Sequence, residues 1–338
     1  MIRILYAVSH TEGLHPTRWL PGLSRVRLIA GARWLVTMLL VSLVLRSIDL
    51  GMLLDLIARA ALPGLGFAGV VVAVQFIVLV WRWQLVMRIL GGAAEGFGPL
   101  SIFLGHSLLV GQVLPSSVGG DVVRTAMLAR LTGTAIAARS VMCDRLLGFA
   151  GLALLAVPAL PVIAAGMGGL TRFPTAAIAV LATVAAGLLV LASAPLIHGV
   201  PWLRDPLATV LGDLRLTVCS GKVSLVAVTL GVGSSILSVL LIYIFGLATG
   251  ANLRLFDCLV LAPPALLVSV LPISLAGWGV REGALVAAFN LVHADPAAVA
   301  ATSVMLGLTT PLIGVAVVAT SLFTGALNLP RSGSRDGG

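Results

Sequence analysis

Charge is what this chain has least of. Only 10% of its 338 residues are Asp, Glu, Lys or Arg, and 59% are hydrophobic. Soluble domains carry about 25% charged residues, so this composition excludes an ordinary water-exposed surface. Long windows without a charged residue include 64–81, 96–120, 146–171, 223–253, 258–280 and 296–330. Several exceed the ~20 apolar residues that a spanning helix needs, and we therefore predict an integral membrane protein.

Lysine and cysteine are also scarce. Lys222 is the one lysine among 21 basic residues, and the net charge is +9. In a membrane protein we interpret this excess as cytoplasmic loop charge and contact with anionic lipids, and we predict no nucleic-acid binding. The three cysteines form no CxxC pair, so neither a metal site nor a disulfide framework is predicted.

Several motifs are missing as well. The sequence contains no P-loop, HExxH, GxSxG or DxD-like acidic pair. ATP hydrolysis and metal-dependent glycosyl transfer are therefore not expected, and no cofactor is predicted. The N-terminus lacks the long apolar stretch and small-residue cleavage site of a removable signal peptide.

One short phrase occurs twice. Residues 113–124 read V-L-P-S-S-V-G-G-D-V-V-R, and residues 270–281, 157 positions later, read V-L-P-I-S-L-A-G-W-G-V-R. In each copy a proline, Pro115 or Pro272, interrupts an apolar helical stretch, glycines follow, and an arginine ends the phrase. Interruptions at matching positions in two halves of a membrane protein indicate a binding site.

The apolar windows predict six full spans, near 28–48, 66–83, 139–163, 175–196, 223–249 and 299–327. The segments 100–131 and 257–292 carry the repeated phrase and lie between the second and third and between the fifth and sixth spans. Their first arms would be about 22 Å long as helices, which is shorter than the ~30 Å hydrocarbon core. We therefore predict that each segment is a re-entrant helical hairpin.

Each half then crosses the membrane three times, and an odd number inverts the second half relative to the first. The predicted fold class is an all-α integral membrane protein, an inverted-topology repeat of two units, each with three spanning helices plus a re-entrant helical hairpin. The predicted parts are a cytoplasmic N-terminal segment 1–27, a first membrane repeat 28–163, a second inverted membrane repeat 175–327 and a disordered tail 328–338.

Basic residues favour a topology with both termini in the cytoplasm. Under it, thirteen Lys and Arg residues, Arg82 among them, fall in inner segments, and three fall in outer segments: Arg59, Arg172 and Arg254. This is the positive-inside pattern. Trp83 falls at a predicted inner span end, where indole rings favour the interface.

Charged residues within the predicted membrane elements include Arg124, Arg145, Arg281, Asp121, Asp144 and Glu282. An arginine at mid-bilayer costs about 2.5–3.5 kcal/mol, so these side chains should face the protein interior or a wet cavity. Asp121 and Arg124 are three residues apart and can pair on one helix. Asp144–Arg145 and Arg281–Glu282 are adjacent, so we expect each of these residues to pair across elements. A set of ion pairs that only fixes helix packing remains the alternative.

The same residue types also suit a phosphate. Glycines near helix starts offer backbone N–H groups to an anion, serines add hydroxyl donors, and arginines add bidentate forks. An anion that reaches mid-membrane with its own apolar tail is a lipid. The predicted substrate-binding residues are Arg124, Arg281, Asp121, Asp144, Arg145, Glu282, Ser117, Ser274, Gly120 and Gly277, with Arg124 and Arg281 meeting around one phosphate. No catalytic or metal-binding residue is predicted.

Three motifs, in order, resemble the lysylphosphatidylglycerol synthase transmembrane family: L-P-S-S-V-G-G-D-V-V-R at 114–124, D-R-L-L-G at 144–148 and G-W-G-V-R-E-G-A-L at 277–285. The resemblance implies a bacterial inner-membrane protein that moves or presents lipids, including aminoacylated phosphatidylglycerol. It implies that the same charged residues and glycines are functional. The chain ends just after the last predicted span, without a soluble aminoacyl transferase domain, so transfer of lysine from tRNA is not expected.

We therefore expect a flippase or transporter of the bacterial cytoplasmic membrane, binding the phosphate headgroup of an anionic or aminoacylated phospholipid or of a polyprenyl-linked lipid. The alternative is a membrane-embedded lipid-modifying enzyme, with an acidic residue or His106 as its base, or a scaffold subunit for such an enzyme. Membrane lipids are the expected partners. A lipid-modifying enzyme as partner, and a homo-oligomer, are left open.

Overall fold

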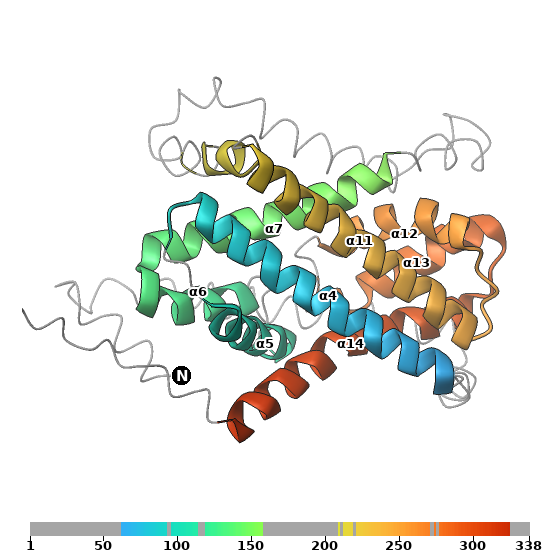
Figure 1. Cartoon of the computed structure of the whole chain (residues 1–338). Coiled ribbons are helices and arrows are strands. Elements are labelled where there is room, and N and C mark those ends of the chain that lie inside the picture. The colour runs from blue at the N-terminus through green and yellow to red at the C-terminus, as the bar shows by residue number, and fades with distance from the viewer. Residues whose placement is uncertain are drawn as a thin grey trace, which may run out of the picture.

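The computed structural model describes residues 62–92, 96–113, 119–157, 209, 212–218, 221–270, 274 and 277–324. Within these ranges every element is a helix (Figure 1): α4 Leu62–Ile89, α5 Phe97–Val113, α6 Gly119–Thr132, α7 Thr134–Ala156, α11 Lys222–Ala248, α12 Leu255–Val270, α13 Val280–Phe289, the 3₁₀ helix η5 Asn290–Val292 and α14 Pro296–Phe323. The predicted spans at 28–48 and 175–196 lie outside the described residues, and so does Ser117.

Four predicted spans correspond to described helices, namely α4, α7, α11 and α14. Three of them, α4, α11 and α14, are long and apolar enough to cross a membrane. Each has 27 or 28 residues and is therefore about 40 Å long at 1.5 Å per residue. The all-helical membrane class predicted from composition is confirmed.

Each segment that was predicted to be a hairpin contains two helices that pack together. In the first, a Cβ added at Gly120 of α6 would lie 2.5 Å from the carbonyl oxygen of Ser107 on α5. This glycine therefore allows the two arms to touch. In the second, Leu261 of α12 shares a buried cluster with Leu285 and Phe289 of α13. The helix interruptions fall where the repeated phrase predicted them.

Helices α4 and α11 cross in opposite directions. The start of α4 packs near the end of α11, where Ala68 and Phe245 share a buried cluster. The end of α4 packs near the start of α11, where Val86 and Ala227 share another. Between these points, Gln75 Nε2 donates to Ser238 Oγ at 2.7 Å. The second spans of the two halves are thus antiparallel neighbours.

The remaining helix contacts occur in matched pairs. Helix α5 packs on α14, and α12 packs on α7; likewise α6 packs on α7, and α13 packs on α14. Glycines allow close crossings: a Cβ at Gly105 would lie 2.6 Å from Val317 of α14, and one at Gly151 would lie 2.5 Å from the carbonyl oxygen of Gly231. Figure 1 shows the α5–α6 pair and the α12–α13 pair towards opposite ends of the molecule, with the crossing of α4 and α11 between them.

The predicted inner end of the second span is wrong. Helix α4 continues to Ile89, so Arg82 lies inside it with only 4% of its surface exposed. Trp83 is fully buried and not at an interface. The prediction ended the span at the first charged residue, but this arginine has buried partners and the helix does not stop there. Arg88 occupies the last turn instead.

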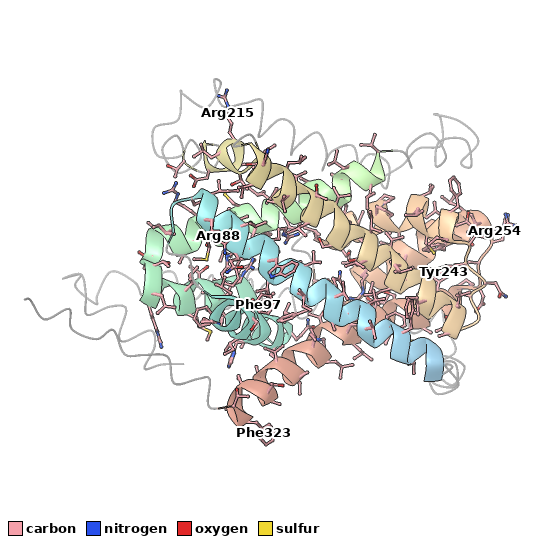
Figure 2. The ribbon with its side chains drawn as sticks, viewed as in Figure 1. Arg88, Phe97, Arg215, Tyr243, Arg254 and Phe323 are labelled. Atoms are coloured by element: carbon pink, nitrogen blue, oxygen red, sulfur yellow. The ribbon has the colours of Figure 1, made fainter. Side chains whose placement is uncertain are left out.

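Basic residues mark the two ends of the molecule. Figure 2 shows Arg88 and Arg215, which were predicted to lie on the inner side, at one end, and Arg254, predicted to lie on the outer side, at the other. Their arrangement relative to the cell stays a prediction.

Candidate functional site

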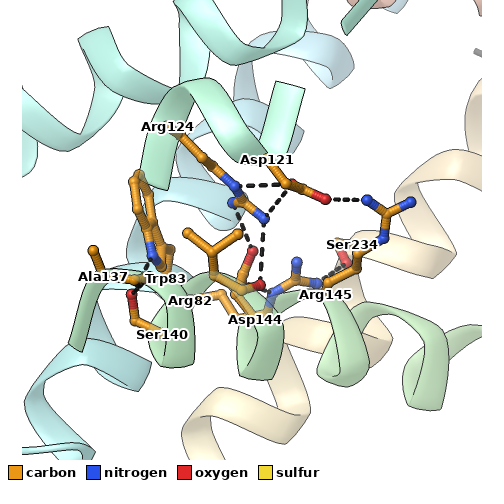
Figure 3. A network of polar contacts seen from close by, with 10 residues as sticks. Arg82, Trp83, Asp121, Arg124, Ala137, Ser140, Asp144, Arg145 and Ser234 are labelled. Carbon is orange, nitrogen blue, oxygen red and sulfur yellow. Dashed lines mark hydrogen bonds and ion pairs between the residues drawn. The ribbon is translucent and has the colours of Figure 1, made fainter. Parts of the chain in front are cut away.

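Asp144 on α7 joins three helices through its carboxylate. It accepts a hydrogen bond from Arg82 Nε on α4 at 2.7 Å and one from Arg124 Nη1 on α6 at 3.0 Å. All three side chains are at most 6% exposed. Arg82 also donates from Nη1 to Ser234 Oγ on α11 at 3.2 Å. Figure 3 shows this carboxylate between the two guanidinium groups.

Every guanidinium nitrogen of Arg124 is engaged within the protein. Its Nε donates to Asp121 Oδ1 at 3.0 Å, which confirms the predicted pair three residues apart. Nη1 contacts Asp144, and Nη2 donates to the carbonyl of Val141 at 3.5 Å. The guanidinium also stacks 5.1 Å from the ring centroid of Trp83. An incoming phosphate would therefore have to displace one of these partners.

The more open edge of this cluster is the pair between Asp121 and Arg145. Arg145 Nη1 donates to the second oxygen of Asp121, and its guanidinium lies 5.4 Å from the centroid of Phe149. Arg145 is 25% exposed and Asp121 16%, against 5–6% for Arg124 and Asp144. A ligand would reach this edge first (Figure 3).

A second ionic cluster lies at the start of α13. Arg281 Nη2 donates to Glu282 Oε1 at 2.6 Å, and Arg281 Nε donates to Ser303 Oγ on α14 at 3.1 Å. Ser303 in turn donates to Glu282 at 3.1 Å. The expectation that Arg281 and Glu282 would pair only across elements is therefore wrong, because both long side chains reach the same serine. For Asp144 and Arg145 the expectation is confirmed.

The helix start in the second hairpin already holds a carboxylate. Glu282 Oε2 accepts the backbone N–H of Gly279 at 2.5 Å, so this N–H is not available to a phosphate while Glu282 stays in place. Gly277 and Gly279 have φ of 80° and 83°, a region that favours glycine. Ser274 is 2% exposed, and its Oγ finds no hydrogen-bond partner among the described residues.

Arg124 and Arg281, which match in the repeat, have matching structural roles. Arg124 ties α6 to α7 through Asp144, and Arg281 ties α13 to α14 through Ser303. Each also stacks on a tryptophan, with Arg281 Cζ 4.9 Å from the ring centroid of Trp278. The three arginines and three acidic residues named from the sequence do not form one set. Glu282 pairs with Arg281 in the cluster at α13, and the cluster around Asp144 also includes Arg82.

Residues beside the two helix interruptions are nevertheless in contact. Trp278 Nε1, within the second repeated phrase, donates at 3.3 Å to Gln112 Oε1, which directly precedes the first phrase. A Cβ at Gly111 would lie 3.6 Å from the Cα of Gly120 in the first phrase. The second repeated phrase thus contacts the C-terminal end of α5, next to the start of α6.

Sequence reasoning missed several residues of these clusters, namely Arg82, Trp83, Ser234, Trp278 and Ser303. One signal could have found Arg82. It follows Gln75 by seven residues and so lies on the same helix face, and both residues bond Ser234. Two polar side chains on one face of an apolar helix indicate a polar partner on its neighbour.

A family model described as "Lysylphosphatidylglycerol synthase TM region" matches residues 29–317, a range that includes both repeated phrases and both clusters. No curated protein and no solved structure matches the chain.

Proposed function

Since the chain belongs to the lysylphosphatidylglycerol synthase TM family, we propose that it binds a lipid through a phosphate headgroup and carries this headgroup across the bacterial cytoplasmic membrane. The substrate would be an anionic or aminoacylated phospholipid or a polyprenyl-linked lipid. The acyl or prenyl chains would stay in the bilayer while the headgroup passes between the hairpins.

The observation that carries this proposal is the contact between Trp278 and Gln112. It joins the end of α5 to the second repeated phrase, and Arg281 stacks on the same tryptophan. A charged headgroup at this depth needs fixed partners of opposite charge, because the hydrocarbon offers none. Buried ion pairs are costly to build for stability alone, which favours a function for these clusters.

Exposure favours Arg145 and Arg281 as the groups that hold the phosphate. Their side chains are 25% and 13% exposed, whereas that of Arg124 is 6% exposed. A phosphate could replace Asp121 on Arg145, or Glu282 on Arg281, so that each arginine exchanges one anion for another. Arg124 would then keep Asp121 and Asp144 in position rather than bind the substrate.

The helix arrangement supports an inverted repeat. The antiparallel crossing of α4 and α11, and the matched pairs α5–α14 and α12–α7, are what two oppositely oriented units would produce. The hairpins lie towards opposite ends of the molecule (Figure 1). In our proposal they are re-entrant from opposite faces, both termini are cytoplasmic, and the units rock about the α4–α11 contact.

Transport of a fluorescent phosphatidylglycerol by the purified protein tests this function. Vesicles that contain the protein should move the lipid to the inner leaflet faster than protein-free vesicles and vesicles with heat-denatured protein. The recovered lipid should have an unchanged mass. Folded protein that moves no lipid and leaves its mass unchanged would contradict the proposal, and a lipid of altered mass would indicate an enzyme instead.

The Gly307→Ala variant should impair transport without harming the fold. A Cβ at Gly307 on α14 would overlap Arg281 Nη2 and lie 2.8 Å from its Cζ, so the guanidinium must shift from its position beside Glu282 and Ser303, which the end of a flexible side chain can do without unfolding the helices. Alanine favours a helix over glycine by about 1 kcal/mol, which offsets part of this cost. We expect transport to fall at least tenfold, because about 1.4 kcal/mol of lost headgroup binding is a factor of ten.

Gly233→Ala on α11 is the matched control, because a Cβ at this position meets nothing within 4 Å. Both variants should melt within a few degrees of the wild type, and only Gly307→Ala should transport slowly. Equal transport rates for the two variants would show that the position of Arg281 does not matter.

A further inference from the structure

A polar pocket of about 450 Å³ lies at the end of the second hairpin. It is formed where α11 leads into α12 and where η5 leads into α14. Its polar and ionisable lining residues are Asn252, Arg254, Asp257, His293 and Asp295. The label of Arg254 in Figure 2 marks this end of the molecule, away from Arg88 and Arg215. None of these five residues belongs to the ionic clusters described above.

His293 occupies a backbone position that would suit glycine better. Its φ is 56°, in the left-handed region that side chains with a Cβ disfavour. The corresponding link in the first half, between α6 and α7, uses Gly133 with φ 85°. The turn therefore does not require histidine, and the side chain is exposed, so packing does not require it either. The turn thus leaves an exposed imidazole among the polar groups that line the pocket.

The charges of the pocket indicate the kind of ligand. Asp257 and Asp295 bring two carboxylates and Arg254 one guanidinium, so acidic groups outnumber the arginine. Asp295 also caps α14 by accepting the N–H of Ala298 at 2.8 Å, so this helix start does not attract an anion. A lone phosphate is therefore disfavoured, whereas an ammonium group is favoured and an attached anion can face Arg254.

We propose that this pocket binds a zwitterion with an ammonium and a phosphate. The ammonium faces Asp257 and Asp295, the phosphate faces Arg254, and the His293 ring hydrogen-bonds the phosphate. The site goes beyond the transport proposed above, since it shares no residue with the two clusters. The zwitterion is either the headgroup of a bilayer lipid or a free solute of the same chemistry.

Titration of the purified full-length protein with phosphoethanolamine, followed by ligand-observed NMR, tests the site. The wild type should bind phosphoethanolamine at least fivefold more tightly than ethanolamine or inorganic phosphate. His293→Gly should weaken this binding at least fivefold and should raise the melting temperature, because glycine relieves the turn. Arg254→Gln should abolish the preference for phosphoethanolamine over ethanolamine, and Arg88→Gln at the other end should bind as the wild type does.

Two results would overturn the site. In the first, the wild type binds phosphoethanolamine no more tightly than ethanolamine or inorganic phosphate. In the second, the His293→Gly variant binds it as tightly as the wild type does. A lower melting temperature with unchanged binding would give His293 a purely structural role. Competition by nanodiscs of phosphatidylethanolamine, but not of phosphatidylglycerol, would assign the zwitterion to a lipid, and no competition by either would assign it to a solute.

Discussion

Asp144→Asn is expected to destabilise the protein by about 3–5 kcal/mol, the usual cost of removing one partner from a buried ion pair. Arg82 and Arg124 both donate to this carboxylate, at 2.7 and 3.0 Å. An asparagine of the same size offers one neutral oxygen to two buried guanidinium groups. The melting temperature in detergent should fall by many degrees, and little folded protein should be recovered.

A second variant separates charge from shape. Arg82→Met combined with Asp144→Leu removes one positive and one negative charge, and apolar replacement of a buried pair is often neutral or stabilising. This double variant should recover much of the stability lost in Asp144→Asn. Asp295→Asn, which keeps an N-cap of equal quality on α14, should melt as the wild type does. If Asp144→Asn had the melting temperature of the wild type, the claim that this carboxylate holds Arg82 and Arg124 in place would be refuted.

The helices and their interruptions were predictable from the sequence because their signals are local. Windows without charge predicted α11 and α14, and the start of α4, within a few residues. Proline and glycine in the repeated phrase located the interruptions between α5 and α6 and between α12 and α13. Each of these features depends on a short stretch of chain and on the apolar environment, and not on a distant partner.

The burial of Arg82 could not be predicted in the same way. A charge at the edge of an apolar window lies in a loop unless another element supplies a partner. Here the partners are Asp144, 62 residues away, and Ser234, 152 residues away. Only the tertiary structure brings these groups together, so the window alone gave the wrong end for the span.

The pairing of Arg281 with Glu282 shows the limit of a rule based on helix faces. Neighbouring residues point in different directions at their Cβ atoms, but long side chains can converge on a shared group, here Ser303.

Gly120 shows a related limit. The sequence indicated a backbone N–H for an anion, while the structure shows that its missing Cβ also lets α6 approach Ser107.

Arg145→Gln is expected to slow lipid transport at least about tenfold while the fold is retained. Asp121 would keep its bonds to Arg124 at 2.9–3.0 Å, so this carboxylate is not left unpaired. The loss of a hydrogen bond from a charged group to the phosphate is worth about 1.5–3 kcal/mol, which corresponds to a fall in transport of tenfold or more. Arg281→Gln should act in the same direction.

The initial rate at which Arg145→Gln moves phosphatidylglycerol into vesicles, relative to that of Arg88→Gln, tests the headgroup site most directly. Arg88 lies in the last turn of α4, outside both clusters, so its variant should transport like the wild type. We predict a rate for Arg145→Gln at least about tenfold lower, with a similar melting temperature. Equal rates for the two folded variants would contradict a headgroup site at the open edge of the cluster.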